Sequence, residues 1–305
     1  MSALNPKIDQ VGNVHQAMYQ QIDQLLQHGL IASASYRSVT ASTNSDAVAD
    51  LQAFAQNAPT SWAEQPSLSA PSPVTLDEVL PRLYITDRQT GGRGRQGSSW
   101  DSSDDAVTFS LLIKLPSTPA IADLLSLAIG VAVARAIEFL CAPVRVKLKW
   151  PNDLCTLFGI DGSSVLQLCK LGGILIEANA AQLDCRVVGV GINLNEAPQI
   201  ANPDALPALA LAKLTGRALA RHAAVAALIE STIEVLDELS EDPDSVLQQY
   251  RDRCALTGQQ LSMQVGDQQI DGLCLGINHA GGLQLQTAGQ VMSLRSGQVK
   301  KIRPQ

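Results

Sequence analysis

Thr90-Gly-Gly-Arg-Gly-Arg-Gln-Gly-Ser-Ser-Trp100 is the most informative stretch of this chain. Four glycines and two arginines fall within the seven positions from Gly91 to Gly97. Glycine reaches positive φ without steric cost and lets the backbone pass close to a ligand. Arginine supplies a rigid fork of donors that matches carboxylates and phosphates. The stretch therefore predicts a flexible, positively charged loop that can close over an anion.

The segments around this loop alternate between strand-like and helix-like patterns. Short runs of apolar and β-branched residues predict strands at 34–40, 83–86, 107–115, 144–150, 173–178 and 186–193. Apolar residues at helical spacing predict helices at 11–30, 46–56, 120–140, 218–239 and 245–254. We expect one residue of Ser42-Thr-Asn44 to cap the second of these helices.

The residues after Gly258 have a different character. β-like runs at 261–265, 270–276, 283–285 and 291–294 alternate with turn residues, which predicts a small separate β-barrel domain. Four prolines within 58–75 indicate a surface loop or insertion. The chain is therefore expected to divide into an N-terminal helical extension (1–34), a large domain (35–257) and a small C-terminal domain (258–305).

The composition excludes several classes of protein. The 305 residues are 46% hydrophobic and 17% charged, with a net charge of −7, which argues against a general nucleic-acid or membrane-surface binder. The apolar stretch at 120–140 is interrupted by Asp123, Arg135 and Glu138, so we expect a buried helix rather than a membrane span. None of the six cysteines forms a CxxC pair, and the first residues lack the basic and apolar regions expected of a signal peptide. We expect reduced thiols, no zinc site and a cytoplasmic location.

Six motifs, taken in chain order, resemble those of the biotin protein ligases. They are Ser42-Thr-Asn44, Gln89 to Gly97 with Trp100, Lys149-Trp-Pro-Asn-Asp153, Lys170-Leu-Gly-Gly-Ile-Leu-Ile-Glu177, Gly189-Val-Gly-Ile-Asn193 and Ser293-Leu-Arg-Ser-Gly297. The resemblance extends from about residue 35 to the C-terminus. Each motif alone is moderate evidence, and their joint order is a strong signal.

The resemblance implies a fold and a reaction. The fold is a class II synthetase-like α/β (α+β) domain, with a mixed, largely antiparallel sheet packed by helices, followed by an SH3-like β-barrel. The reaction is ATP-dependent formation of biotinyl-5'-adenylate and transfer of biotin to a lysine of a biotin carboxyl carrier domain. Biotin and ATP are the substrates, with Mg²⁺ as the metal. The resemblance also implies a monofunctional enzyme without a DNA-binding domain, and a homodimer.

This chemistry suits the residues of the motifs. Biotin carries a carboxylate that must attack the α-phosphorus of ATP, so two anions must be brought together by cations and dipoles. Arg93 and Arg95 can supply charge from a loop, and Lys170 can supply a point charge. The adenylate is a mixed anhydride that water destroys, and a loop that orders over it would exclude water.

The resemblance assigns roles to individual positions. Lys170, Arg93 and Asp153 are the predicted catalytic residues, with Asp153 also a candidate Mg²⁺ ligand or base for the incoming lysine. The predicted biotin-binding residues are Ser42, Thr43, Asn44, Gln89, Arg93, Gly94, Arg95, Lys170, Gly173 and Gly191. The predicted ATP-binding residues are Arg95, Trp100, Asn152, Asp153, Asn193 and Arg295.

Structural explanations stay open at several positions. Ser42-Thr-Asn44 is also suited to capping a helix, and Lys149 to a strand edge. Gly189 and Gly191 fit close approach of either a ligand or a neighbouring strand. Arg295 also fits an ordinary surface residue. An extra stretch at 157–164 predicts a protruding hairpin, which would either contact the carrier or be a neutral insertion.

Rival functions differ in what they require. A lipoate or octanoate ligase shares the fold and the central lysine, but the glycine-arginine loop and the Lys149 to Asp153 motif favour biotin. A biotin-responsive repressor would need a DNA-binding domain. No GxxxxGK[ST] segment is present, which excludes a P-loop NTPase. An RNA-binding Arg/Gly protein would need repeats of a segment that occurs once.

Overall fold

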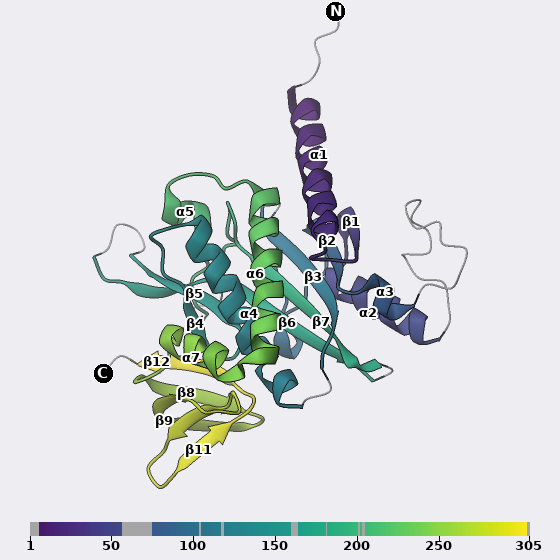
Figure 1. Ribbon diagram of the computed structural model, residues 1–305. Coiled ribbons are helices and arrows are strands. Elements are labelled where there is room, and N and C mark those ends of the chain that lie inside the picture. Colours follow the sequence, from purple (N-terminus) through teal and green to yellow (C-terminus); the bar gives the residue numbers. More distant parts are fainter. Residues whose placement is uncertain are drawn as a thin grey trace, which may run out of the picture.

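A seven-stranded mixed sheet, in the order β1-β2-β3-β7-β6-β5-β4, forms the centre of the fold (Figure 1). The computed structural model describes residues 6–56, 75–103, 105–116, 119–159, 164–180, 182–200, 202 and 205–303. The pair β1–β2 is parallel and the other neighbouring pairs are antiparallel. The predicted mixed, largely antiparallel sheet is thus confirmed. Its strands are β1 (Ser33–Thr40), β2 (Arg82–Gln89), β3 (Val107–Lys114), β4 (Lys147–Lys149), β5 (Asp153–Phe158), β6 (Gln167–Asn179) and β7 (Gln182–Ile192).

Helices cover both faces of this sheet. Successive strand residues point to opposite sides, and apolar side chains on both sides are buried under these helices. On β2, Tyr84 belongs to the small cluster under α2 (Thr43–Ala55) and α3 (Leu76–Val79), whereas Leu83 and Ile85 belong to the main core. The main core packs against α4, α6 and α7 (Figure 1). The remaining helices are α1 (Pro6–Gln27), α4 (Pro119–Leu140), η2 (Arg95–Gly97), α5 (Leu211–Thr215), α6 (Arg221–Glu241) and α7 (Pro243–Arg253).

The apolar stretch at 120–140 forms α4, as predicted, and packs against both the sheet and α6, beside which it lies (Figure 1). Two of its charged residues are paired with neighbouring helices: Arg135 with Glu238 at 2.6 Å and Glu138 with Arg253 at 2.9 Å. Among the described residues, no helix is long and apolar enough to cross a membrane.

The hairpin expected at 157–164 is seen only at its base. Strands β5 and β6 pair out to Leu157↔Leu168 and Phe158↔Gln167, while residues 160–163 lie outside the described part of the chain. The loop expected at 58–75 also lies outside the described residues, apart from Thr75. The strand expected at 144–150 is shorter than predicted, because β4 pairs with β5 over three residues only.

The C-terminal residues form an open five-stranded antiparallel sheet rather than the predicted closed barrel. Its order is β11-β10-β9-β8-β12, and within the described chain β11 and β12 remain on opposite edges. Closure would require these edge strands to pair, but β12 pairs with β8 after the turn at Gly297. The strands are β8 (Gln260–Val265), β9 (Gln268–Ile277), β10 (Leu283–Gln286), β11 (Val291–Leu294) and β12 (Gln298–Arg303), of which β12 was not predicted.

The C-terminal sheet is attached to the large sheet through shared core residues. Leu261, Leu285 and Leu148 lie in one hydrophobic cluster, and Trp150 Nε1 donates a hydrogen bond to Gly281 O at 3.1 Å. Trp150 itself is 2% exposed, and the contact is partly buried. The division of the chain at residue 258 stays a prediction.

Candidate active site

A cavity of about 180 Å³ opens between the glycine-arginine loop, the start of α2, strands β5 to β7 and the start of β12. Most of the residues singled out from the sequence line it, although they come from segments more than a hundred positions apart. These lining residues are Ser42, Thr43, Asn44, Gln89, Arg93, Gly94, Arg95, Trp100, Asn152, Asp153, Lys170, Gly173 and Gly191.

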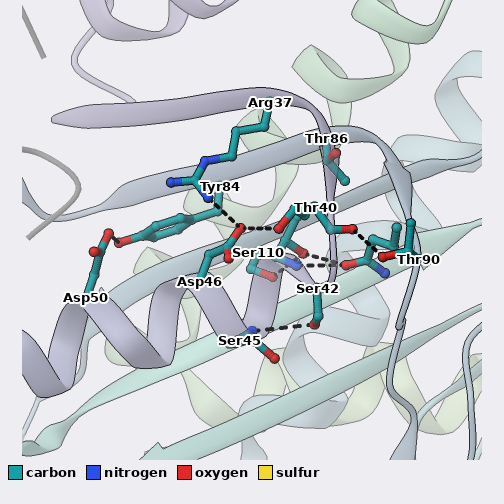
Figure 2. A network of polar contacts seen from close by, with 12 residues as sticks. Arg37, Thr40, Ser42, Ser45, Asp46, Asp50, Tyr84, Thr86, Thr90 and Ser110 are labelled. Carbon is teal, nitrogen blue, oxygen red and sulfur yellow. Dashed lines mark hydrogen bonds and ion pairs between the residues drawn. The ribbon is translucent and has the colours of Figure 1, made fainter. Parts of the chain in front are cut away.

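The start of α2 is held in place by polar side chains. Ser42 Oγ accepts a hydrogen bond from Ser45 N at 3.4 Å, so Ser42 is the helix cap (Figure 2). Thr40 Oγ1 donates to Asp46 Oδ2 at 2.7 Å, and Arg37 lies 3.8 Å from the same oxygen (Figure 2). These contacts tie the first turn of α2 to the end of β1, and they orient the residues that follow Ser42.

One wall of the cavity is a buried polar network. Gln89 Oε1 accepts hydrogen bonds from Thr43 N at 2.8 Å and Thr43 Oγ1 at 3.1 Å. Ser110 Oγ lies 2.7 Å from Thr43 Oγ1 and 2.6 Å from Asn44 Oδ1. Each of these four residues is at most 9% exposed. The wall therefore presents oriented donors and acceptors to the cavity in a poorly hydrated setting, where they discriminate strongly between ligands.

Two glycines of β7 leave room for cavity residues. A Cβ on Gly189 would lie 2.1 Å from Asn44 Oδ1, and one on Gly191 would lie 2.5 Å from the Trp100 ring. Close approach of protein side chains therefore requires glycine at both positions. Of the two readings left open by the sequence, these contacts support approach of a neighbouring segment.

The loop itself is ordered over the cavity by a few contacts. Gly94 N donates to Ser98 O at 2.7 Å, and Gln96 and Gly97 adopt positive φ values of 53° and 75°. Arg93 Nη2 lies 2.7 Å from Glu177 Oε2. Arg95 Nη1 donates to Asn152 Oδ1 at 3.4 Å. Both guanidinium groups thus reach from the loop to the large sheet.

Partial burial makes Arg95 an unusual cation. Desolvation lowers the pKa of its guanidinium, and the nearby Asp153 carboxylate acts in the opposite direction. An arginine remains protonated in proteins at physiological pH. The cavity therefore holds a permanent, partly desolvated positive charge that an anion can neutralise.

Two lysines share one carboxylate at the floor of the cavity. Lys170 Nζ lies 2.6 Å from Asp153 Oδ1, and Lys149 Nζ lies 2.9 Å from Asp153 Oδ2. Burial acts to raise the pKa of Asp153, but the ammonium groups of Lys149 and Lys170 outweigh it and hold that pKa below its ordinary value of 3.8. The cluster therefore carries a net positive charge at neutral pH.

Two predicted ATP-binding residues lie outside this cavity. Asn193 is 2% exposed, and its Nδ2 donates to Lys170 O at 3.3 Å, so it supports the strand that carries the lysine. Arg295 Nη1 lies 3.3 Å from Asp123 Oδ2 and lines an adjoining cavity together with Arg95 and Pro151. Arg295 therefore lines a different cavity from Lys170, and Arg95 lines both cavities.

Some lining or supporting residues were missed from the sequence. Ser110 is buried in the apolar strand β3. A serine within an otherwise apolar run was the sequence signal that could have indicated it. Glu177 ends the Lys170 motif, and its Oε2 accepts hydrogen bonds from Asn44 Nδ2 and Arg93. Gly297, the last residue of the Ser293 to Gly297 motif, reaches the cavity together with Gln298 and Val299, and no local pattern indicated the last two.

Comparisons with known proteins agree with the motifs. The model of the Biotin/lipoate A/B protein ligase family matches residues 79–193. The biotin–[acetyl-CoA-carboxylase] ligase of Mycobacterium tuberculosis is 30% identical over 241 residues, which cover 77% of this chain and 83% of that protein. The bifunctional ligase/repressor BirA of Escherichia coli is 28% identical over 220 residues, covering 70% of this chain and 64% of that protein.

Solved structures share the fold. A biotin protein ligase from Aquifex aeolicus, in complex with biotin and ATP, has a TM-score of 0.66 at 22% identity, and the match covers 90% of this chain and 99% of that one. A biotin protein ligase from Leishmania major in complex with biotinyl-5-AMP has a TM-score of 0.52 at 19% identity, covering 86% of this chain and 98% of that one. The chain therefore belongs to the biotin/lipoate A/B protein ligase family, and its relatives place it among the biotin protein ligases.

Proposed function

We propose that this chain activates biotin with ATP to biotinyl-5'-adenylate and then transfers biotin to a lysine of a biotin carboxyl carrier domain. The observation that carries the proposal is the gathering of Lys170, Arg93 and Arg95 around one cavity that also has a polar wall. The Mycobacterium tuberculosis relative and the Aquifex aeolicus structure reported above are named as biotin ligases, which favours biotin over lipoate or octanoate.

In the first step, a carboxylate oxygen of biotin attacks the α-phosphorus of ATP and pyrophosphate leaves. Repulsion between the two anions opposes this approach, and fixed cations in a poorly hydrated cavity offset that repulsion most effectively. Lys170 is suited to the junction because its ammonium group sits on the cavity floor, between the polar wall and Asn152. Arg93 and Arg95 add charge from above.

The polar wall suits the ureido head of biotin, which offers donors and an acceptor. Thr43, Asn44 and Gln89 would contact it, with Ser42 holding the helix start and Ser110 holding Thr43 and Asn44 in orientation. Gly94 and Gly173 line the same cavity and would contact the ligand through their backbone, whereas Gly191 leaves room for the Trp100 ring.

The nucleotide would lie at the end marked by Trp100, Asn152 and Asp153. Asn152 Nδ2 donates to Ile174 O at 2.7 Å, which leaves its Oδ1 beside Arg95. Arg295 lines the adjoining cavity, so we assign it to the outer phosphates. In this proposal Asn193 does not contact the nucleotide itself but supports the backbone of Lys170.

Mg²⁺ usually keeps several waters and is held by one or two carboxylates together with substrate phosphates. Among the described residues, no group of three or more His, Cys, Asp and Glu side chains lies close enough to form a metal site. Asp153 is the carboxylate at the cavity floor, and both of its oxygens engage lysines. A single carboxylate is enough for an ion that is held mainly by phosphates. We assign Asp153 to this role, in which its negative charge would balance part of the charge of Mg²⁺.

In the second step, the acceptor amine attacks the carbonyl carbon of the adenylate and AMP leaves. The loop at 90–100 would exclude water from the mixed anhydride until the acceptor arrives. Asp153 is a poor candidate for the base that deprotonates the amine, because its pKa is lowered. Normal transfer from preformed adenylate in Asp153→Asn would remove the base role altogether.

The carrier, the homodimer and the cytoplasmic location belong to the same proposal. The hairpin of β5 and β6 carries Asp153 and Lys170; Leu157, near the end of β5, and Leu166, just before β6, are both exposed. A carrier lysine that enters the cavity would bring its domain close to these residues, whereas a neutral insertion would make no contact with it.

Mass spectrometry provides the direct test. The full chain is incubated with biotin, ATP, Mg²⁺ and an apo carrier domain, and we expect the carrier to gain one biotinyl group on a single lysine. A parallel ATP–pyrophosphate exchange assay compares biotin with lipoate and octanoate. Exchange with lipoate but not biotin would overturn the proposal in favour of the lipoate alternative.

A further inference from the structure

One carboxylate oxygen joins the polar wall of the cavity to the loop above it. Glu177 Oε2, on β6, accepts hydrogen bonds from Asn44 Nδ2 at 2.8 Å and from Arg93 Nη2 at 2.7 Å. Asn44 belongs to the first turn of α2 and Arg93 to the glycine-arginine loop. The contact therefore connects three elements that are far apart in the sequence.

The Asn44 side of this junction is rigid. Asn44 is 4% exposed, its Oδ1 lies beside Ser110, and its Nδ2 also donates to Leu175 O at 3.3 Å. Every polar atom of the amide is thus engaged, and Gly189 packs against it. Glu177 consequently presents its oxygen from a defined position.

On the Arg93 side, the tip of the loop is tied to the rest of the protein by few polar contacts. The backbone hydrogen bonds near the loop tip are internal: Gly94 N to Ser98 O, and Trp100 N to Gly92 O. The contacts that cross from the tip to the large sheet are made by side chains, Arg93 to Glu177 and Arg95 to Asn152. The Arg95 contact is longer, at 3.4 Å, so the Glu177 ion pair is the stronger of the two.

We propose that Glu177 is a positioning residue that holds the loop closed over the empty cavity and keeps Arg93 aimed at the place where the substrate carboxylate binds. The inference rests on the proposed function for the identity of that carboxylate. A loop ordered in advance loses less conformational freedom when the acid binds, so the contact improves affinity without touching the ligand.

Glu177→Gln is the appropriate variant, because glutamine keeps an acceptor oxygen for Asn44 but removes the charge that Arg93 pairs with. The first readout is cleavage by trypsin after Arg95 in the ligand-free full chain, followed by mass. We expect cleavage about five-fold faster than in the parent protein, the size expected for loss of a partly exposed ion pair. Unchanged cleavage would overturn the proposal.

The second readout separates positioning from catalysis. We expect the KM for biotin to rise by about the same factor, with kcat within about two-fold of the parent value. A lowered KM would contradict the proposal, since it would mean that Glu177 competes with the substrate for Arg93. Glu138→Gln, which breaks the ion pair with Arg253 outside the cavity, is the matched control for general loss of stability.

The reciprocal variant tests the partner. Arg93→Gln lies on the loop and leaves the core intact, and cleavage after Arg95 remains measurable in it. Adding Glu177→Gln to Arg93→Gln should change the cleavage rate no further. A full additional increase would show that Glu177 acts through Asn44 alone, and would overturn the proposal. If the parent protein exchanges pyrophosphate with neither acid but Glu177→Gln is still cleaved faster, the positioning role of Glu177 stands and the proposed function is refuted.

Discussion

Lys170 Nζ lies 2.6 Å from Asp153 Oδ1, on two strands, β6 and β5, that pair at the floor of the cavity. The other oxygen of Asp153 is held by Lys149 at 2.9 Å. When Lys170 turns toward a ligand, Asp153 keeps a second ammonium partner, so its charge is never left unpaired. The arrangement thus lets Lys170 move at little electrostatic cost.

Replacing Lys170 with methionine removes the charge and keeps a chain of similar length. We expect ATP–pyrophosphate exchange with biotin to fall at least about 100-fold, because the loss of one charged donor at the reacting centre costs that much. Biotin binding, measured by calorimetry, should weaken far less. Lys114→Met, at an exposed ion pair with Asp77, is the control and should retain full exchange. Parent-level exchange in Lys170→Met would refute the role.

Asp153 links the site to the pH dependence of stability. Its folded pKa lies below the ordinary value of 3.8, so the ionised carboxyl stabilises the fold fully above 3.8, and that stability is lost as pH falls through the folded pKa. Asp153→Asn leaves two partly buried ammonium groups without their counter-charge. At neutral pH we expect the free energy of unfolding to fall by about 3 kcal/mol.

The difference between Asp153→Asn and the parent should shrink once the pH is below 3.8, because the parent carboxyl is then also being neutralised. Urea unfolding at several pH values measures it. Asp77→Asn, at an exposed pair, serves as the control and should change stability by less than about 0.5 kcal/mol. A difference that is constant with pH would refute the linkage.

The fold was largely predictable because its signals are local. The apolar and β-branched runs of β2 and β3 and the long apolar run of α4 indicate those elements without knowledge of their neighbours. Strand β12 was missed because its sequence, Gln298-Val-Lys-Lys-Ile-Arg303, mixes polar residues into a short edge strand. The closed barrel was wrong because closure depends on which edges pair, a long-range choice that short runs do not encode.

The site was predictable in part, for a similar reason. Lys170 and the loop arginines belong to contiguous motifs, whereas Ser110 and Glu177 act through partners 66 and 84 positions away. Their contribution depends on the register β3–β7–β6, which brings Ser110 opposite Gly189 and Glu177 opposite Val187. No spacing rule along the chain contains that information.

Ser110→Ala tests a residue that sequence patterns did not indicate. Thr43 Oγ1 and Asn44 Oδ1 would both lose a partner within 2.7 Å, which should cost about 1–2 kcal/mol of unfolding free energy. We also expect the KM for biotin to rise about five-fold, because the wall loses its orientation. Ser240→Ala, an exposed serine on α6, is the control in both assays. A KM equal to that of the control would remove Ser110 from the wall.

Gly191→Ala tests the nucleotide end of the cavity. The new Cβ would lie 2.5 Å from the Trp100 ring, and no positive φ strains the backbone there, so the clash alone decides the outcome. Because Trp100 sits on the loop while Gly191 is paired on both sides within the sheet, the ring must give way. We expect the KM for ATP to rise about ten-fold, with biotin binding largely kept, since a misplaced ring would not stack on the base of a nucleotide bound as proposed. Gly289→Ala, where a Cβ meets nothing within 4 Å, is the matched control. An unchanged KM for ATP would mean that Trp100 does not contact the nucleotide, and a loss confined to biotin would move the ring to the other end of the cavity.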